Sequence, residues 1–312
     1  MSVSREAQPI VAQPERRHIT DLKRVARRLH RNDRVATVLL WGIGGFVALL
    51  FIGIIIKLLV DGMPALVKPS FFLGTDDADI AKQIFNTFYL LILTEAFLFP
   101  IALAAAIYLV EYAPQGKLVA TIHFAAETLA GVPSLVLGMF GFLVFGIYMQ
   151  LGISRLSGAL TLLCLNFPLA LRLFEEALSS VPRELREAGL AMGASKWYVI
   201  RTVVLPSAVP GIITGLILTA GKIIGESAAL LFTMGTFSPA NVFTLNPLIG
   251  SDTLTTRLYY VKGPGAGQTG LEPMQETALA AGIAAVLIVV LFVINIGARA
   301  LGRALQKKWT AA

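Results

Sequence analysis

The sequence predicts an all-α integral membrane protein with six membrane-spanning helices. Of its 312 residues, 56% are hydrophobic and only 14% are charged, whereas about 25% are charged in a typical soluble domain. The charged residues lie mostly outside long apolar runs, and a bilayer core requires about 20 consecutive apolar residues per helix. The net charge of +7 therefore does not indicate a nucleic-acid partner, and the lipid bilayer is the expected surrounding.

The predicted spans are apolar runs of bilayer length that follow one another along the chain. They comprise residues 36–56, 85–110, 131–149, 156–171, 208–232 and 278–298. The first and the last contain no charge, the second carries Glu95, and the fifth carries Lys222 and Glu226. Six spans place both termini on the same side of the membrane.

Two segments beside these runs are not predicted to be spans. Residues 16–34 are basic and are expected to form a helix next to the membrane. Residues 118–130 are apolar but carry His123 and Glu127 one helical turn apart. This segment is expected either to lie in the membrane interface or to re-enter the membrane, with the two side chains as an interfacial pair rather than a metal site.

Lysine and arginine are unequally distributed between the two sides of the predicted spans. The side of the termini has 18 of them, and the opposite side has 5. Because basic residues are retained in the cytoplasm, both termini are predicted to be cytoplasmic. The chain then divides into an N-terminal tail of residues 1–35, a transmembrane domain of residues 36–305, and a C-terminal tail of residues 306–312.

The cytoplasmic connection of residues 174–206 has the punctuation of two short helices. Pro182 suits the first turn of the first helix, and Gly193 can adopt the left-handed conformation that ends it. Ser195 can cap the second helix, and Pro206 marks the start of the fifth span. A short amphipathic helix that projects from a membrane bundle suits the groove of a partner protein.

This connection resembles the cytoplasmic loop of permeases of the ATP-binding-cassette (ABC) importers, which reads Glu-Ala-Ala, three residues, Gly, nine residues, Ile, one residue, Leu-Pro. Gly189 replaces the third residue of that pattern and Val203 replaces the isoleucine. The resemblance implies a MetI-like fold whose coupling helix docks onto a separate ATPase subunit. The matching positions expected to carry coupling are Glu187, Ala188, Gly189, Gly193, Leu205 and Pro206.

Residues 129–141, 220–233 and 253–260 are similar to phosphate transport permeases, and the last two favour the PstA type over the PstC type. The resemblance covers residues 36–310. It implies a permease for inorganic phosphate in the cell inner membrane, paired with a PstC-type permease, PstB-type ATPase subunits and an extracytoplasmic PstS-type phosphate-binding protein. An importer for another oxyanion or small solute is the alternative.

Three ionisable residues within the predicted spans are candidates for the substrate path, because a charge at membrane depth is costly unless it has a function or a partner. Lys222 and Glu226 are four residues apart and are expected to share one helical face. Lys222 would attract the anion, and Glu226 would hold the lysine in an empty path or accept a hydrogen bond from a protonated phosphate. The alternative is a structural ion pair between subunits. Glu95 could pair with Lys222 or Arg172, or reach a polar cavity.

Other classes of function lack supporting motifs. The sequence shows no nucleophile and base pair, no metal-ligand cluster, no cofactor loop and no nucleotide-binding motif. We therefore expect no catalytic site, metal or cofactor, and ATP hydrolysis has to come from a partner chain. A self-sufficient secondary carrier is disfavoured, since six spans with a docking loop indicate half of a transport assembly.

Overall fold

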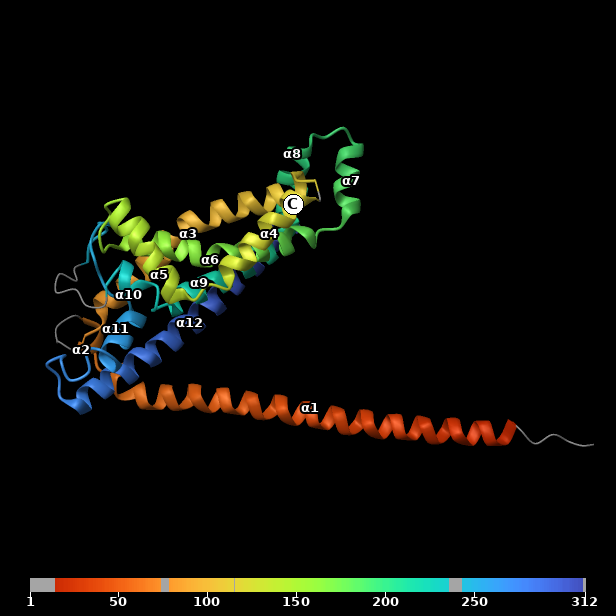
Figure 1. Ribbon diagram of the computed structural model, residues 1–312, viewed down its shortest axis with the longest axis horizontal. Coiled ribbons are helices and arrows are strands. Elements are labelled where there is room, and N and C mark those ends of the chain that lie inside the picture. Colours follow the sequence, from red (N-terminus) through yellow and green to blue (C-terminus); the bar gives the residue numbers. More distant parts are fainter. Residues whose placement is uncertain (1–14, 74–78, 115, 236–242, 311–312) are drawn as a thin grey trace, which may run out of the picture. The chain divides into compact units, whose positions relative to one another are not determined.

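The computed structural model describes residues 15–73, 79–114, 116–235 and 243–310, and all regular structure within these ranges is helical (Figure 1). Five of the described helices are long and apolar enough to cross a membrane. A bent pair of helices adds a sixth crossing if it counts as one span. The predicted all-α membrane fold is thus confirmed. The chain forms two compact units, residues 1–57 and 58–312.

Helix α1 (Glu15–Leu66) joins two segments that the sequence predicts separately. The basic stretch of residues 16–34 and the first apolar run of residues 36–56 are one continuous helix of 52 residues. Its part from Asp33 to Leu66 has a mean hydropathy of 2.7, as expected of a span. No proline or glycine pair interrupts the junction of the two stretches, so the helix has no local reason to end there.

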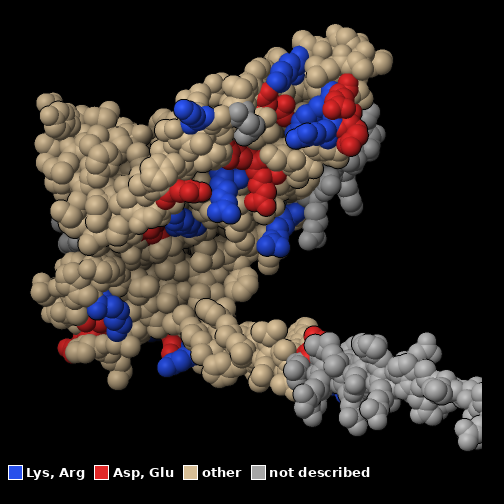
Figure 2. Space-filling view, turned by 45° about the vertical axis from the view of Figure 1, so that its right-hand side comes forward, with Lys and Arg blue, Asp and Glu red and all other residues tan. Residues whose placement is uncertain are grey.

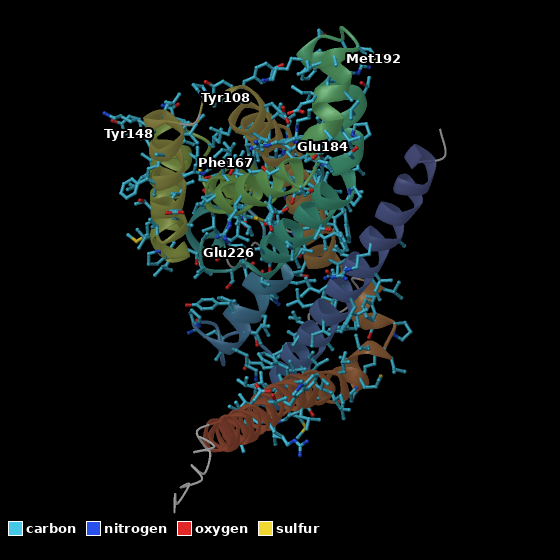
Figure 3. The ribbon with its side chains drawn as sticks, turned by 90° about the vertical axis from the view of Figure 1, so that its right-hand side faces the viewer. Tyr108, Tyr148, Phe167, Glu184, Met192 and Glu226 are labelled. Carbon is cyan, nitrogen blue, oxygen red and sulfur yellow. The ribbon has the colours of Figure 1, made fainter. Side chains whose placement is uncertain are left out.

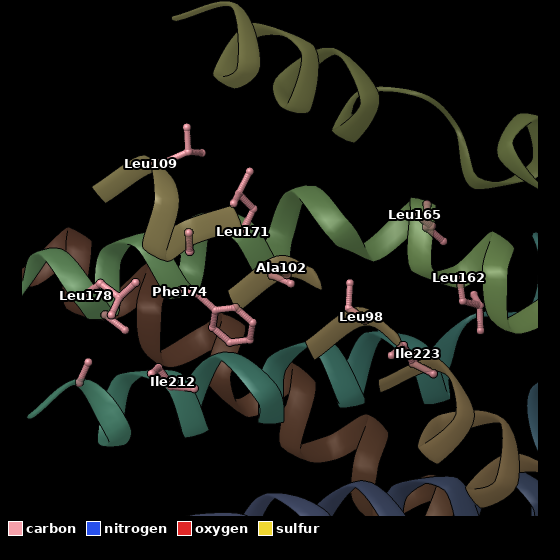
Figure 4. Packing of buried hydrophobic residues seen from close by; sticks show 14 of the residues in the cluster. Leu98, Ala102, Leu109, Leu162, Leu165, Leu171, Phe174, Leu178, Ile212 and Ile223 are labelled. Atoms are coloured by element: carbon pink, nitrogen blue, oxygen red, sulfur yellow. The ribbon is translucent and has the colours of Figure 1, made fainter. Parts of the chain in front are cut away.

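The bundle of the second unit is built around α3 (Ala81–Ile107), α6 (Arg155–Ser179) and α9 (Leu205–Gly225). Their buried side chains form one hydrophobic cluster, part of which Figure 4 shows. Helix α12 (Pro273–Thr310) packs against α9. A smaller cluster joins α12 to α2 (Ser70–Leu73) and α11 (Leu254–Lys262).

Small residues bring α6 and α9 close together. A Cβ atom at Gly211 would lie 2.6 Å from the Cβ of Ala177, and one at Gly215 would lie 2.9 Å from the ring of Phe174. In a membrane, helices associate through close van der Waals packing, because lipid is as apolar as the side chains. The two glycines therefore allow the contact that holds the centre of the bundle.

The third predicted span is one arm of a bent pair. Helix α4 (Lys117–Ala130) is followed by α5 (Ser134–Gly141) and the π-helical η2 (Phe142–Tyr148), and the two arms meet at 100°. The predicted run of residues 131–149 corresponds to the second arm. The first arm is the segment that the sequence predicts either to lie in the membrane interface or to re-enter the membrane. It packs against α6.

The fifth predicted span ends earlier than the sequence suggests, at Gly225 instead of residue 232, which corrects the prediction. Helix α9 ends at Gly225, Glu226 is extended with φ −78° and ψ 130°, and the short helix α10 (Leu230–Thr233) follows. The hydroxyl of Thr255, at the start of α11, donates to the Glu226 carbonyl over 2.9 Å. A tertiary contact thus fixes this turn, and Lys222 and Glu226 do not share a helical face.

A buried arginine, Arg155, organises the connection between α10 and α11. Arg155, at the start of α6, is fully buried and donates to Asn86 Oδ1 (2.6 Å) and Ser251 Oγ (2.9 Å). Its guanidinium also lies 5.0 Å from the ring centroid of Tyr89. The side chain therefore ties the loop before α11 to α3 and α6, whereas its sequence position indicated only a basic residue in a loop.

Candidate functional sites

The connection of residues 174–206 folds as the two-helix hairpin that the sequence predicts. Helix α7 (Arg183–Ala191) begins after Pro182, and Gly193 has a φ of +81°. Ser195 caps α8 (Lys196–Val199), since its Oγ accepts a hydrogen bond from the Tyr198 amide over 3.3 Å. The π-helical η3 (Ile200–Val204) follows and leads into α9, with Pro206 in its first turn. We call residues 183–204 the coupling hairpin.

The coupling hairpin projects from one end of the bundle (Figure 1). Several of its apolar side chains are exposed. No residue of α7 is buried, and Glu187 and Ala188 are both exposed. Charged side chains gather at this end in Figure 2, whereas much of the remaining surface in that view carries none. An apolar surface with a charged rim is typical of a protein interaction site. Its large exposed apolar residues are Leu185, Leu190, Met192, Trp197 and Tyr198.

The packing of α7 on α8 explains why position 189 is a glycine. A Cβ atom there would lie 2.8 Å from Cγ2 of Val199, which is 3% exposed and cannot move away freely. The glycine that replaces the alanine of the loop pattern therefore leaves the space that the Val199 side chain occupies. Leu205 and Pro206, the last positions of the pattern, are half-buried where η3 passes into α9.

Arg186 fastens α7 to two other helices, a role that no sequence pattern indicated. Its Nε donates to Glu111 Oε1 over 2.9 Å, in the π-helical η1 (Tyr108–Tyr112) that continues α3. Its two terminal nitrogens donate to the carbonyls of Val181 (2.5 Å) and Leu178 (2.7 Å) at the end of α6. Glu111 lies 75 positions away in the sequence, beyond any local pattern.

A cavity of about 480 Å³ lies between α4, α6 and α9 and contains Lys222. Lys222 is exposed in this subunit, and its Nζ donates over 3.4 Å to the carbonyl of Leu165. The same cavity is lined by Arg172, seven residues and roughly 10 Å further along α6 than Leu165. That separation is about one third of a bilayer core, so the cavity reaches from membrane depth toward the coupling hairpin. Its other ionisable lining residues are His123, Glu127 and Glu175.

The structure does not bring the three predicted path residues together. Within the described residues no ion pair joins Lys222 to Glu226, whose Oε1 instead accepts from the Ala229 amide over 3.2 Å. Figure 3 shows Glu226 well away from Met192 at the tip of the coupling hairpin. Glu95 pairs with neither Lys222 nor Arg172.

The actual partner of Glu95 is a hydroxyl group. Thr219 donates to Glu95 Oε1 over 2.7 Å, while the buried Oε2 has no hydrogen-bond partner among the described residues. Glu95 thereby links α3 to α9 one turn before Lys222. It is not among the residues that line the cavity around Lys222.

The histidine of α4 also has a different partner from the one expected. His123 Nδ1 lies 3.7 Å from Glu175 Oε2 on α6, so the expected pair with Glu127 is wrong. Both His123 and Glu127 line the cavity, which the sequence did not indicate, because the bend after α4 places this segment beside α6. In the described part of the chain, no group of three His, Cys, Asp or Glu side chains is placed to hold a metal ion.

Solved structures that resemble this fold include two ABC transporters. In a bacterial alginate ABC transporter in complex with its pentasaccharide-bound periplasmic protein, the similar chain has a TM-score of 0.63 and 19% identity, covering 91% of this chain and 99% of that one. A chain of the MetNI methionine ABC transporter in an inward-facing conformation has a TM-score of 0.58 and 21% identity, covering 72% and 95%. At these identities the likeness shows the MetI-like fold alone.

Sequence relatives are more similar. The probable ABC transporter permease protein YqgI of Bacillus subtilis is 36% identical over 296 residues, which cover 89% of this chain and 98% of the relative. A PstA homolog of Mycoplasma pneumoniae is 34% identical over 73% of this chain and 36% of its own length. The phosphate transport permease PstA 1 of Mycobacterium tuberculosis is 40% identical over 44% of each chain.

Residues 98–310 match the family of binding-protein-dependent transport system inner membrane components. This range holds α6, α9, the coupling hairpin and the cavity around Lys222. The chain belongs to this family of membrane-embedded, multi-pass ABC transporter permeases.

Proposed function

We propose that the chain is the PstA-type permease subunit of an importer for inorganic phosphate. The observation that carries this proposal is the cavity in which Lys222 and Arg172 line the same space within the bundle. The names of the relatives from Mycoplasma pneumoniae and Mycobacterium tuberculosis point to the same substrate. An anion that crosses the low-dielectric core requires fixed positive charge along its route.

Lys222 is the residue that we assign to anion contact. Among the described residues, its ammonium group bonds only to the Leu165 carbonyl, over 3.4 Å, so it retains donors for a ligand. Arg172 adds the planar fork that lysine lacks and that suits phosphate oxygens. Glu95 and Glu226 bond to Thr219 and Ala229. In the proposal, these two acids fix the segments before and after Lys222.

Coupling to ATP hydrolysis is assigned to the coupling hairpin, which would dock into a groove of a PstB-type ATPase. The exposed apolar residues of α7 and α8 support this interface. A PstC-type permease would complete the translocation path, and a PstS-type protein would deliver phosphate from outside. The chain would be a transport subunit without a catalytic site of its own. Coupling is assigned to Glu187, Ala188, Gly189, Gly193, Leu205 and Pro206.

The proposed orientation in the inner membrane has both termini in the cytoplasm. The tails would comprise residues 1–35 and 306–312, and residues 36–305 would form the transmembrane domain. The excess of basic residues on the side of the termini supports this orientation. A reporter fused near Gly265 should report an extracytoplasmic location, and a cytoplasmic signal there would contradict the six-span topology.

The proposal is tested by reconstituting the permease pair and its ATPase in proteoliposomes with the binding protein outside. ATP inside the vesicles should drive accumulation of radiolabelled phosphate, and omission of either ATP or the binding protein should prevent it. Unlabelled phosphate should compete, whereas molybdate and methylphosphonate should not. If one of these anions, and not unlabelled phosphate, reduces uptake, the subunit belongs to an importer for that other oxyanion.

A further inference from the structure

Arg186 belongs to the coupling hairpin and contacts the end of the α3 span. The backbone does not connect α3 directly to the hairpin. The hairpin is continuous with α6 before it and with α9 after it, so movement of the hairpin reaches those two helices through the backbone. Helix α3 is separated from the hairpin in sequence by α4, α5 and α6. Any movement of α3 with the hairpin therefore depends on side-chain contacts.

Two such contacts meet in η1, the last turn of the α3 span. Glu111 accepts from Arg186 of α7 over 2.9 Å, and the two side chains are 7% and 17% exposed. The neighbouring Tyr112 ring lies with its centroid 5.0 Å from Nζ of Lys196 in α8. Each helix of the hairpin thus holds η1 through a cationic side chain, which is more than packing alone would require.

The local geometry at these contacts differs from a regular α-helix. The segment η1, which α7 contacts through Arg186, and the segment η3, which packs against α7, are both π-helical. This conformation is rare overall and often occurs at functional sites. In a π-helical turn each hydrogen bond joins residues five apart instead of four, which sets both segments apart from the α-helices that they continue. The contacts of Arg186 with Leu178 and Val181 also anchor the guanidinium to the end of α6, which gives the contact to Glu111 a fixed base.

We propose that Arg186 is the positioning residue that transmits movement of the coupling hairpin to α3 through Glu111. Helix α3 carries this movement into the bundle, where its Glu95 is bonded to Thr219 one turn before Lys222 on α9. Closure of the ATPase would then act on three helices of the bundle: on α6 and α9 through the backbone, and on α3 through the Arg186–Glu111 ion pair. The inference rests on the proposed docking of the ATPase at the hairpin.

The decisive measurement is amide hydrogen exchange of the full complex with and without ATP, which requires no knowledge of the substrate. In the unmodified complex, ATP should change the protection of both η1 and η3. In an Arg186→Ala variant, η3 should still respond, because it is part of the hairpin. The response of η1 should fall, since the ion pair with Glu111 is lost while the Tyr112–Lys196 contact remains. A response of η1 in the variant equal to that of the unmodified complex would overturn the proposal, as would an η1 that never responds.

Transport gives a second readout. Uptake of phosphate per ATP hydrolysed should fall on the order of tenfold in Arg186→Ala, within the range of allosteric coupling. The matched control is Lys117→Ala, which removes a positive charge from the exposed start of α4, outside the coupling hairpin, and leaves the contact with Glu111 intact. An equal loss in both variants would indicate a general effect of positive charge and would contradict the role of Arg186.

Two further variants keep the test informative. If Arg186→Ala prevents assembly, Glu111→Ala removes the acceptor and leaves the contacts of Arg186 with Leu178 and Val181 in place, and it should also lower the response of η1. Arg186→Lys should restore part of the η1 response through its charge. An unmodified complex that transports no phosphate while η1 responds to ATP would contradict the proposed substrate and leave the role of Arg186 supported.

Discussion

The coupling hairpin and the segment around Lys222 were both predicted from short sequence patterns, but the structure agrees with only one of them in detail. In the hairpin, the predicted cap at Ser195 and the left-handed glycine at Gly193 are present. At the end of α9, the predicted continuous helix through Glu226 is absent and an extended residue takes its place. The two regions differ in which contacts determine their conformation.

Local contacts determine the hairpin. The cap of Ser195 involves an amide three residues away, and the positive φ of Gly193 is a property that glycine adopts without a side-chain penalty. The turn at Glu226 instead depends on Thr255, which lies 29 positions further along the chain. Patterns within a few residues are therefore reliable in the hairpin and misleading at the end of α9.

The largest expected effect concerns Lys222. Lys222→Gln should lower phosphate uptake roughly ten- to hundredfold, the equivalent of losing one charged hydrogen bond of about 1.5 to 3 kcal/mol. Lys222→Arg should retain most of the activity. Lys262→Gln is the matched control, because this exposed lysine bonds only to Thr277 among the described residues. Uptake and co-purification of the ATPase should be measured together.

The same variants distinguish a path residue from a scaffold residue. Because Lys222 and Glu226 form no pair within the subunit, the double variant Lys222→Gln with Glu226→Gln should be as inactive as Lys222→Gln alone. Recovery of both assembly and uptake in the double variant would show a structural pair. That pair would then have to form across the subunit interface.

A smaller effect is expected at Gly193. Gly193→Val places a β-branched residue at a φ of +81°, which costs about 1 to 3 kcal/mol of strain and redirects α8. Uptake per ATP hydrolysed should fall. Gly152→Val is the matched control, since Gly152 has a φ of +63° with equally open surroundings but lies before α6, outside the hairpin. The Gly152→Val variant should lose a similar amount of thermal stability and keep normal coupling. Uncoupling in both variants would argue against a specific role for the hairpin.

The smallest effect is expected at Glu226. Glu226→Gln keeps an oxygen that can accept from the Ala229 amide, so uptake should change by less than about twofold, within the usual range of neutral substitutions. Glu226→Ala removes the acceptor and should lower the free energy of unfolding by about 1 kcal/mol, the usual cost of losing a helix cap. Abolished uptake in Glu226→Gln would mean that the negative charge itself is required. Glu226 would then be assigned to the substrate path.

Most of the membrane architecture could be predicted from the sequence, because bilayer thickness imposes a length on each apolar run. The candidate site was predicted only in part. Lys222 was identified from its charge within an apolar run, but its cavity partner Arg172 was not, because Arg172 lies near a predicted span end where charges are ordinary. The role of Arg186 was equally hidden, since a basic residue in a cytoplasmic loop is expected on grounds of topology alone.

The sequence by itself determined the membrane class, the apolar runs, the hairpin and its resemblance to importer permeases. These depend on composition, on runs of bilayer length and on contacts within a single turn of the chain. The tertiary structure alone decided that the chain bends by 100° between α4 and α5, that Arg155 is buried and that Glu111 pairs with Arg186. Each of these joins residues from segments far apart in the sequence, where the free energy of a contact depends on packing that no local pattern encodes.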